Sequence, residues 1–310
     1  MNKPFDRTRR QLLKLMGGAS LAATTPVLLA GQKSASYFSK PIPSSGEQIP
    51  VIGLGTSRVF NVGDDPAALG KLREVTRILA AVPNSMVDTS PMYGASERVV
   101  GDLVKDLGVR RELFFATKVW TNGRQAGIEQ MQQSMRLMQT ATIDLMQIHN
   151  LVDWKTHIST LRDWKERGLI RYLGITHYDE SAHDAVVRVM RQTPLDFLQI
   201  NYSLAEPEAE NKVLPLARDK GTAVIANRPF ARGALFRATR GQSLPAWAQE
   251  IDCASWAQFF LKFVVSHPAV TCAIPATSKA RHMLDNQTAA KGRMPDSALR
   301  EKMRAFMRSV

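Results

Sequence analysis

The chain has 310 residues, of which 44% are apolar and 22% are charged; this predicts one large folded domain and excludes an extended disordered chain. The formal net charge of +13 would suit a nucleic-acid partner, but residues 1–35 carry six basic residues against one acidic residue and so account for +5 of it. The rest is spread over many expected helices without a run of five basic residues, so we interpret it as solvated helix faces and expect no nucleic-acid partner.

Residues 1–35 have the pattern of a twin-arginine export signal. Arg9 and Arg10 stand in "TRRQLLK", and an uncharged stretch rich in Gly, Ala and Thr follows at 15–32. We therefore predict a signal peptide, export by the twin-arginine machinery, and a periplasmic or otherwise exported location. Interior glycines, Pro26 and low hydrophobicity disfavour a spanning helix, so no stable membrane insertion is expected. No Ala-x-Ala sequence precedes the mature chain, which leaves both cleavage and retention as an anchor open.

Beyond the leader, short apolar runs alternate with amphipathic stretches. Residues 37–56 indicate two short strands around the turn "SSGE", then a buried strand that ends at Gly55. Further strands are expected at 85–89, 112–119, 142–149, 170–176, 195–201, 222–227 and 270–275. Helices are expected near 66–81, 95–107, 124–139, 155–167, 179–191, 207–219, 254–267, 279–289 and 296–308.

Eight strand–helix units with buried strands favour a closed parallel barrel over an open sheet. The predicted fold class is α/β, a (β/α)8 TIM barrel with an N-terminal β-hairpin and extra C-terminal helices, formed by residues 36–310 as one domain. "GLGTSR" lacks the third glycine that a dinucleotide-binding open sheet would show. Cys253 and Cys272 are predicted to be buried free thiols, because a helix roughly 18 Å long would separate them.

Such a barrel carries its chemistry at the C-terminal ends of its strands. The expected strand ends are rich in polar side chains, namely Asp88, Tyr93, Lys118, His149, Asn150, Thr176, His177, Gln199, Asn201, Asn227, Arg228, Thr277 and Ser278. Asp88, Tyr93, Lys118 and His149 come from three consecutive strands. We therefore expect these four side chains to face one another across the barrel mouth.

The order of the motifs resembles that of aldo-keto reductases over residues 38 to about 290. The matching segments are "GLGT", "VDTSPMYG", "ATKVW", "IDLMQIH", "LGIT", "QINY", "RPF" followed by Gly233, and "IPATSKARHMLDN". The resemblance implies an oxidoreductase that transfers hydride between NADP(H) and a carbonyl or alcohol substrate. It also implies a catalytic tetrad of Asp88, Tyr93, Lys118 and His149, with no metal.

Residue chemistry independently supports this tetrad. A free tyrosine titrates at about 10, and a neighbouring ammonium group favours the phenolate, which would make Tyr93 a better acid. Lys118 supplies the charge, Asp88 keeps it charged and oriented, and His149 orients the carbonyl. Tyr93 is then predicted to give a proton to the carbonyl oxygen while the nicotinamide delivers hydride to the carbon. Taken alone, His149 would be interpreted as a core histidine.

The resemblance implies that Thr176 and Gln199 hold the carboxamide of the nicotinamide and that the last strand's loop binds the adenosine end. The candidate cofactor-binding residues are Thr56, Thr176, His177, Gln199, Asn227, Arg228, Phe230, Thr277, Ser278, Lys279, His282 and Asn286. Lys279 or Arg281 would pair with a 2′-phosphate and favour NADP(H); as plain exposed helix residues they leave NAD(H) open.

Three positions depart from the family pattern. His177 stands where the family often has Asn, Asn227 where an aromatic ring usually stacks on the nicotinamide, and His282 where many members have a phosphate-binding Arg. We hypothesise that Arg228 and Arg232 compensate for Asn227 by reaching the pyrophosphate.

Candidate substrate-binding residues are Trp120, which resembles the family's pocket aromatic, and Asn150. For Trp120, packing at the barrel rim is an equal alternative. A monomer is expected. The altered nicotinamide pocket and the export signal leave a second function open, namely a nucleotide-binding sensor or partner-binding subunit with little turnover. A barrel hydrolase is disfavoured, because only Asp88 is well placed and a paired strand-end carboxylate is missing.

Overall fold

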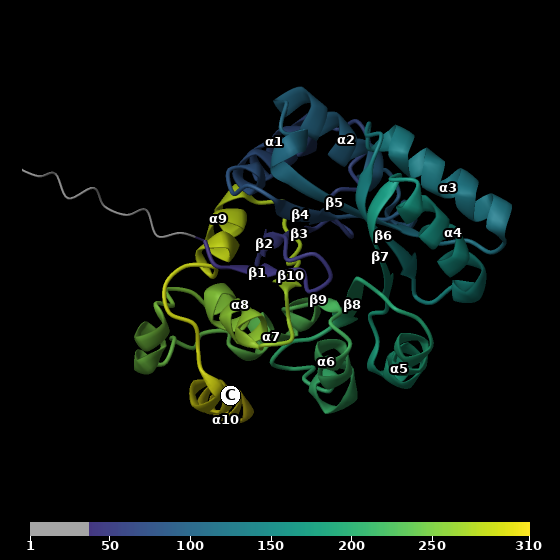
Figure 1. Cartoon of the computed structure of the whole chain (residues 1–310). Coiled ribbons are helices and arrows are strands. Elements are labelled where there is room, and N and C mark those ends of the chain that lie inside the picture. Colours follow the sequence, from purple (N-terminus) through teal and green to yellow (C-terminus); the bar gives the residue numbers. More distant parts are fainter. Residues whose placement is uncertain (1–36) are drawn as a thin grey trace, which may run out of the picture. The chain divides into compact units, whose positions relative to one another are not determined.

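Eight parallel strands follow one another around the molecule in chain order (Figure 1). The computed structural model describes residues 37–310, so the predicted export signal lies outside the described residues. The strands are β3 (Leu54–Gly55), β4 (Ser85–Asp88), β5 (Leu113–Val119), β6 (Ile143–His149), β7 (Ile170–Thr176), β8 (Phe197–Asn201), β9 (Ala223–Asn227) and β10 (Cys272–Ala273). Parallel bridges from Ile52 to Ala273 and from Gly55 to Ala276 join the two ends of the sheet. The predicted parallel barrel is thereby confirmed.

Helices alternate with the strands and cover the outside of the barrel (Figure 1). They are α1 (Pro66–Ala80), α2 (Ser96–Leu107), α3 (Arg124–Leu137), α4 (Trp154–Glu166), α5 (His183–Gln192), α6 (Ala209–Asp219), α8 (Trp256–Ser266) and α9 (Ala280–Thr288), with α10 (Ser297–Arg308) after the last unit. In α2, for example, Val99, Val100, Leu103 and Val104 are buried, as the helical spacing of apolar residues predicts. Within residues 37–310, no helix has both the length and the hydropathy to cross a bilayer.

Three local features differ from the sequence prediction. The helix expected from 179 begins only at His183, because Asp179 accepts a hydrogen bond from the Ser181 amide and starts a 3-10 turn first. The first barrel strand is reduced to β3, two residues long. The connection after β9 contains α7 (Ala234–Ala238) and a 3-10 helix (Ala246–Ile251), where the sequence predicted no helix.

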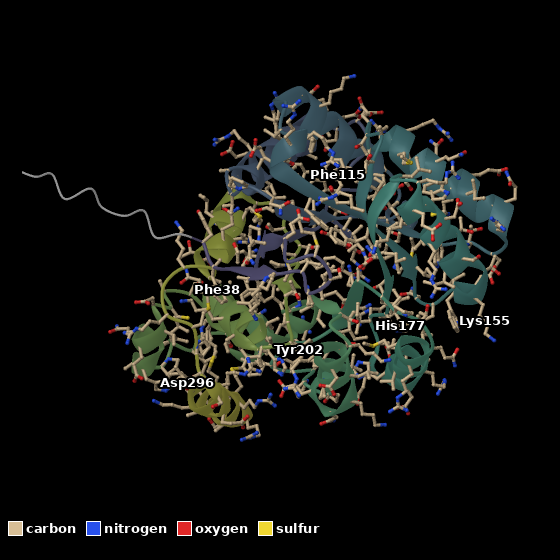
Figure 2. The ribbon with its side chains drawn as sticks, in the orientation of Figure 1. Phe38, Phe115, Lys155, His177, Tyr202 and Asp296 are labelled. Atoms are coloured by element: carbon tan, nitrogen blue, oxygen red, sulfur yellow. The ribbon has the colours of Figure 1, made fainter. Side chains whose placement is uncertain are left out.

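Figure 2 draws the side chains on the ribbon, and the buried apolar ones form two layers. One layer lies between the strands and the helices, and the other lies inside the barrel, where Phe114, Leu145, Tyr172 and Phe197 pack together. Side chains alternate along a strand, so every second residue points inward. From β4 to β9 this inward row is apolar in its first half and polar near the C-terminal end of the strand, which is where a site can form.

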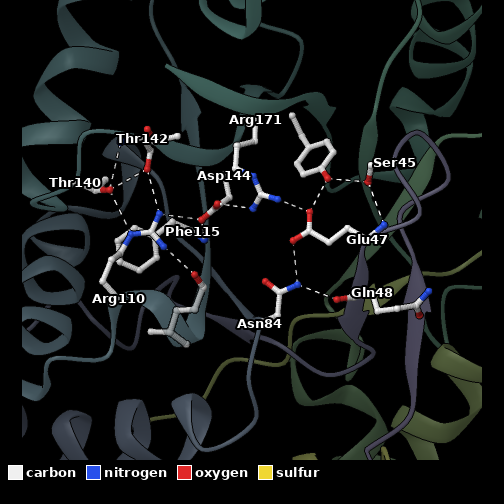
Figure 3. Close-up of polar contacts among 12 residues, drawn as sticks. Ser45, Glu47, Gln48, Asn84, Arg110, Phe115, Thr140, Thr142, Asp144 and Arg171 are labelled. Carbon is white, nitrogen blue, oxygen red and sulfur yellow. Dashed lines mark hydrogen bonds and ion pairs between the residues drawn. The ribbon is translucent and has the colours of Figure 1, made fainter. Parts of the chain in front are cut away.

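The N-terminal hairpin, β1 (Ser39–Pro41) and β2 (Gln48–Pro50), packs Ile42 and Ile49 against the apolar layer inside the barrel. Between the two strands, Glu47 forms an ion pair with Arg171 and accepts a hydrogen bond from the Tyr172 hydroxyl at 2.6 Å (Figure 3). Arg171 also pairs with Asp144 at 2.8 Å. The hairpin is thus fixed to β6 and β7 at the end of the barrel opposite the strands' C-terminal ends.

Cys253 and Cys272 are both buried free thiols, as predicted. Burial raises the pKa of the Cys253 thiol to about 11 and that of the Cys272 thiol to about 12. Both groups are therefore uncharged at neutral pH and behave as small apolar side chains.

Candidate active site

A cavity of about 770 Å³ opens at the C-terminal ends of the strands. A cavity of this size accommodates a small ligand or a cofactor. The predicted site residues that line it are Thr56, Asp88, Tyr93, His149, Asn150, Thr176, Gln199, Asn227, Arg228 and Phe230. These residues come from most of the strand–helix connections, so the fold gathers residues that are far apart in the sequence.

Lys118 is fully buried on the inward row of β5 and contacts Asp88 at the end of β4. Its Nζ lies 2.7 Å from Asp88 Oδ2 and donates to the Thr89 carbonyl, also at 2.7 Å. Burial opposes the charge, but the attraction of Asp88 and then of Tyr93 outweighs it and raises the pKa of Lys118 above its ordinary value. Lys118 is therefore an ammonium ion at neutral pH, and Asp88 holds it in place.

Tyr93 is placed by a short 3-10 turn, Pro91–Tyr93, that follows β4. Ser90 caps this turn, Pro91 occupies its first position, and Gly94 ends it with a φ of 62°. The Tyr93 ring centroid lies 5.2 Å from Lys118 Nζ. The sequence-based expectation was a phenol made more acidic by Lys118. Here burial outweighs the attraction of Lys118 and raises the pKa of Tyr93, so Tyr93 retains its proton at neutral pH.

His149 ends β6 and lies beside Tyr93, with the two ring centroids 5.8 Å apart in an edge-to-face arrangement. Its Nδ1 lies 2.9 Å from the Ser90 hydroxyl. Burial, then repulsion from Lys118 and His177, lowers the pKa of His149 to about 3. The imidazole is therefore neutral at physiological pH and offers either a donor or an acceptor to a ligand.

A chain of amides extends from Asp88 across the floor of the cavity. Asp88 Oδ1 accepts hydrogen bonds from Gln147 at 3.1 Å and from Gln199 at 2.8 Å. Thr176 donates to Gln199 Oε1 at 3.2 Å. Thr176 and Gln199, which the family resemblance assigns to the nicotinamide carboxamide, are thus already bonded to each other, although both still line the cavity.

The sequence analysis did not identify Gln147 or Tyr178. Gln147 lies on the inward row of β6 between Leu145 and His149, so strand alternation was the signal that could have identified it. Tyr178 follows β7, is 38% exposed and lines the cavity. Its ring stacks on His177, with centroids 5.3 Å apart, and an aromatic residue next to a strand-end histidine was the only sequence signal for it.

Asn227 and Arg228 occupy the end of β9. Asn227 Nδ2 donates to the His177 carbonyl at 3.0 Å, while Asn227 Oδ1 is buried and has no partner among the described residues. The Arg228 guanidinium lies 4.1 Å from the Tyr178 ring centroid. Burial, then repulsion from Arg232, lowers the pKa of Arg228.

Three arginines, Arg58, Arg228 and Arg232, line the cavity. None of the three forms an ion pair with another residue of the described range 37–310. Like charges at short range repel, so an anion bound among them would relieve the repulsion. Two of these arginines, Arg228 and Arg232, belong to the connection after β9 and are candidates for holding an anion.

The predicted residues of the last loop do not line the cavity. Thr277 and Asn286 are buried, and the Thr277 hydroxyl accepts from the Lys279 amide at 3.1 Å. Ser278 is half-buried, and Lys279 and His282 are exposed at the start of α9. Burial, then repulsion from Arg281 and Lys279, lowers the pKa of His282. Lys279, Arg281 and His282 are thus exposed basic residues of the segment that follows Pro275 and Ala276, which do line the cavity.

The two candidate substrate-binding residues flank His149. Trp120 is 40% exposed, and its ring centroid lies 6.3 Å from that of His149. Asn150 lines the cavity, and its Oδ1 has no partner among residues 37–310. In the same part of the chain, no group of three or more His, Cys, Asp or Glu residues is arranged to hold a metal ion.

Enzymes with a closed (β/α)8 fold carry their active sites at the C-terminal mouth of the barrel. Polar and ionisable side chains gather at that mouth here, which is the arrangement of an enzyme of this fold. The family model described as "Aldo/keto reductase family" matches residues 51–302, and the chain belongs to this family.

Two curated relatives and one solved structure illustrate the similarity. "Aldo-keto reductase YhdN" of Bacillus subtilis (strain 168) is 29% identical over 63% of this chain and 62% of its own length. "Methylglyoxal reductase YeaE" of Escherichia coli (strain K12) is 28% identical over 80% of this chain and 88% of its own. The aldo-keto reductase of Klebsiella pneumoniae in complex with NADPH superposes with a TM-score of 0.72 at 22% identity, covering 88% of this chain and 95% of the other.

Proposed function

We propose that this protein is an NADP(H)-dependent reductase of aldehydes or ketones that works with Tyr93 as its proton donor. The observation that carries the proposal is the fully buried Lys118 ammonium, 2.7 Å from Asp88 and 5.2 Å from the centre of the Tyr93 ring. A buried lysine is costly without a partner, and here its position next to a phenol gives it a chemical use.

The residues divide the work of carbonyl reduction as follows. The nicotinamide, when bound, supplies hydride. The Tyr93 hydroxyl keeps its proton in the free protein and donates it to the substrate oxygen as negative charge develops there. Lys118 stabilises the phenolate that Tyr93 becomes, and Asp88 keeps Lys118 oriented. His149, which is neutral, orients the carbonyl with a hydrogen bond.

The residues of the cavity fit a nicotinamide nucleotide. Arg228 and Arg232, which form no ion pair within residues 37–310, offer positive charge to a pyrophosphate, and the buried Asn227 Oδ1 offers an acceptor with no partner in that range. Lys279 and Arg281 would pair with a 2′-phosphate. The solved Klebsiella pneumoniae relative is in complex with NADPH, which supports the same cofactor here.

The test is stopped-flow mixing of NADPH-loaded protein with a panel of aliphatic and aromatic aldehydes, following the absorbance of the reduced nucleotide. Wild type should oxidise the nucleotide in a single turnover. Tyr93→Phe, which removes one oxygen, should bind NADPH with the same dissociation constant but react on the order of 10²–10⁴ times more slowly.

Tight nucleotide binding without turnover of any aldehyde would contradict the reductase and favour the sensor or partner-binding function. The observation that favours this second function is Asn227, which stands where the family usually has an aromatic ring that stacks on the nicotinamide. The reductase names of the two relatives favour turnover instead.

We further propose that the protein is a monomer exported by the twin-arginine pathway with its nucleotide bound, because this pathway carries folded proteins. Arg9, Arg10 and the uncharged stretch 15–32 support the proposal. Native mass spectrometry of protein recovered from the periplasm would report leader cleavage, oligomeric state and bound nucleotide together. Recovery from the cytoplasm alone, or an Arg9→Lys/Arg10→Lys variant that is exported equally well, would contradict it.

A further inference from the structure

Ser90 is a buried residue that the catalytic scheme above leaves without a role. It is 0% exposed, and it lies between Asp88 and the turn that carries Tyr93. Its hydroxyl makes two contacts: it accepts from the Met92 amide at 3.2 Å and lies 2.9 Å from His149 Nδ1. Its carbonyl accepts from the Tyr93 amide at 2.9 Å. Ser90 therefore contacts the His149 ring through its hydroxyl and the backbone of Tyr93 through its carbonyl.

The hydrogen on the Ser90 oxygen decides which nitrogen of His149 carries a proton. The Met92 contact uses Ser90 as an acceptor, so among the described residues the hydroxyl hydrogen has only His149 Nδ1 to bond to. If Nδ1 were protonated, it would donate to the Ser90 oxygen, and the hydrogen of the Ser90 hydroxyl would be buried without a partner among the described residues, which is costly. The hydrogen bonds are therefore satisfied when Ser90 donates to Nδ1 and the ring proton sits on Nε2.

We propose that Ser90 is a positioning residue that holds His149 in the Nε2–H tautomer, so that the imidazole presents a donor to the substrate oxygen. The proposal rests on the proposed carbonyl reduction. A neutral imidazole in the other tautomer would present a lone pair to the carbonyl oxygen and repel it. The same hydroxyl caps the 3-10 turn of Tyr93, so one side chain sets both hydrogen-bond donors.

The tautomer can be read directly by long-range proton–nitrogen NMR of nitrogen-15 histidine-labelled protein. His149→Gln identifies the signals, since the chain has six histidines. We expect wild type and Ser90→Thr, which keeps the hydroxyl, to show a protonated Nε2 and an unprotonated Nδ1. Ser90→Ala should show a mixture of tautomers. Thr160→Val is the matched control: it removes a buried hydroxyl on α4 that has no partner within residues 37–310, and it should leave the His149 signals unchanged.

Turnover supplies a second readout. Ser90→Ala should lower kcat about tenfold, the effect of one hydrogen bond, while Ser90→Thr restores it and the dissociation constant of NADPH stays the same. A wild-type spectrum with the proton on Nδ1 overturns the proposal even if no variant folds. A Ser90→Ala protein that keeps the Nε2–H form and the wild-type kcat also overturns it. Because the spectra do not depend on turnover, a protein without reductase activity would refute the proposed function separately.

Discussion

At the scale of single residues, the site depends on groups whose protonation is set by burial. His149 is the clearest case, because its folded pKa is about 3 and its ordinary value is 6.5. Above pH 6.5 the histidine is neutral in both the folded and the unfolded chain. Below that pH His149 gains a proton in the unfolded chain but not in the folded protein, so the free energy of unfolding falls as the pH drops from about 6.5 toward 3.

We predict that His149→Asn reduces this loss. Between pH 6.5 and pH 4.5 the wild type should lose about 2–3 kcal/mol more free energy of unfolding than the variant does. Urea unfolding at the two pH values measures the difference. The exposed His282→Asn should change the acid dependence far less. Identical acid dependence of His149→Asn and wild type would show that the imidazole is not shielded as described.

Some features of the site's residues could be predicted from the sequence, and others could not. Asp88, Tyr93, Lys118 and His149 could be predicted to come together, because a parallel barrel brings all strand ends to one face. The raised pKa of Tyr93 could not be predicted, since it depends on how much water the folded cavity excludes. Ser90 was equally invisible, because a serine before a proline indicates only a turn and its contact with His149 spans 59 positions.

At the scale of elements, the hairpin closes the barrel at the end opposite the cavity. Glu47 is one of its polar links, since it contacts Arg171, Tyr172 and Asn84 (Figure 3). Interior apolar residues of the strands and the hairpin's Ile42 and Ile49 form one layer beneath the catalytic candidates. The hairpin end of the barrel therefore contributes to stability, and the opposite end carries the candidate active site.

We predict that Glu47→Gln lowers the free energy of unfolding by about 1–3 kcal/mol, because it removes the negative charge of the half-buried Glu47, which contacts Arg171 and the Tyr172 hydroxyl. Chemical denaturation measures this loss. NADPH affinity should be unchanged, because the substitution lies at the far end of the barrel. Asp106→Asn, which removes one partner of the exposed pair with Arg73, is the control and should cost less than 1 kcal/mol or so. A change in NADPH affinity in Glu47→Gln without a loss of stability would contradict the separation of the hairpin end from the active-site end.

The connection after β9 is the element that the sequence described least well. The sequence predicted no helix between the strand at 222–227 and the helix at 254–267, but a short helix, α7, forms there, and Arg228, Arg232 and Phe236 line the cavity. Helices of five residues are too short for apolar periodicity to identify. Arg228 and Arg232 both line the cavity, as the hypothesis that they reach the pyrophosphate requires, whereas the short helix beside them could not be predicted.

We predict that Arg228→Ala and Arg232→Ala each raise the dissociation constant of NADPH about tenfold, as the loss of one charge-assisted hydrogen bond would. The effect should shrink as salt is added. Fluorescence titration of the nucleotide gives the constant. Arg240→Ala, an exposed arginine of the same connection, is the control. Unchanged affinity in both cavity variants would remove these arginines from the cofactor site.

At the scale of the whole molecule, the order of the strands around the barrel brings strand-end residues that are far apart in the sequence together in one site. The strands were predictable because each is short, apolar and followed by turn residues, and the helices because their apolar residues recur at helical spacing. The shape of the mouth was not predictable, because it depends on the connections, where Tyr178, Phe236 and the three arginines meet. Family membership accordingly fixes the architecture, while these connections would set the substrate.

The most direct test of the account is the single-turnover rate of carbonyl reduction in a Lys118→Met variant. Methionine keeps the buried apolar stem and removes the charge, and Asp88→Asn/Lys118→Met is a companion that leaves no unpaired carboxylate. We predict that both variants bind NADPH normally and transfer hydride on the order of 10²–10⁴ times more slowly than wild type. Hydride transfer at a rate within a few-fold of wild type would show that Tyr93 does not need the ammonium group, and would contradict the proposed chemistry.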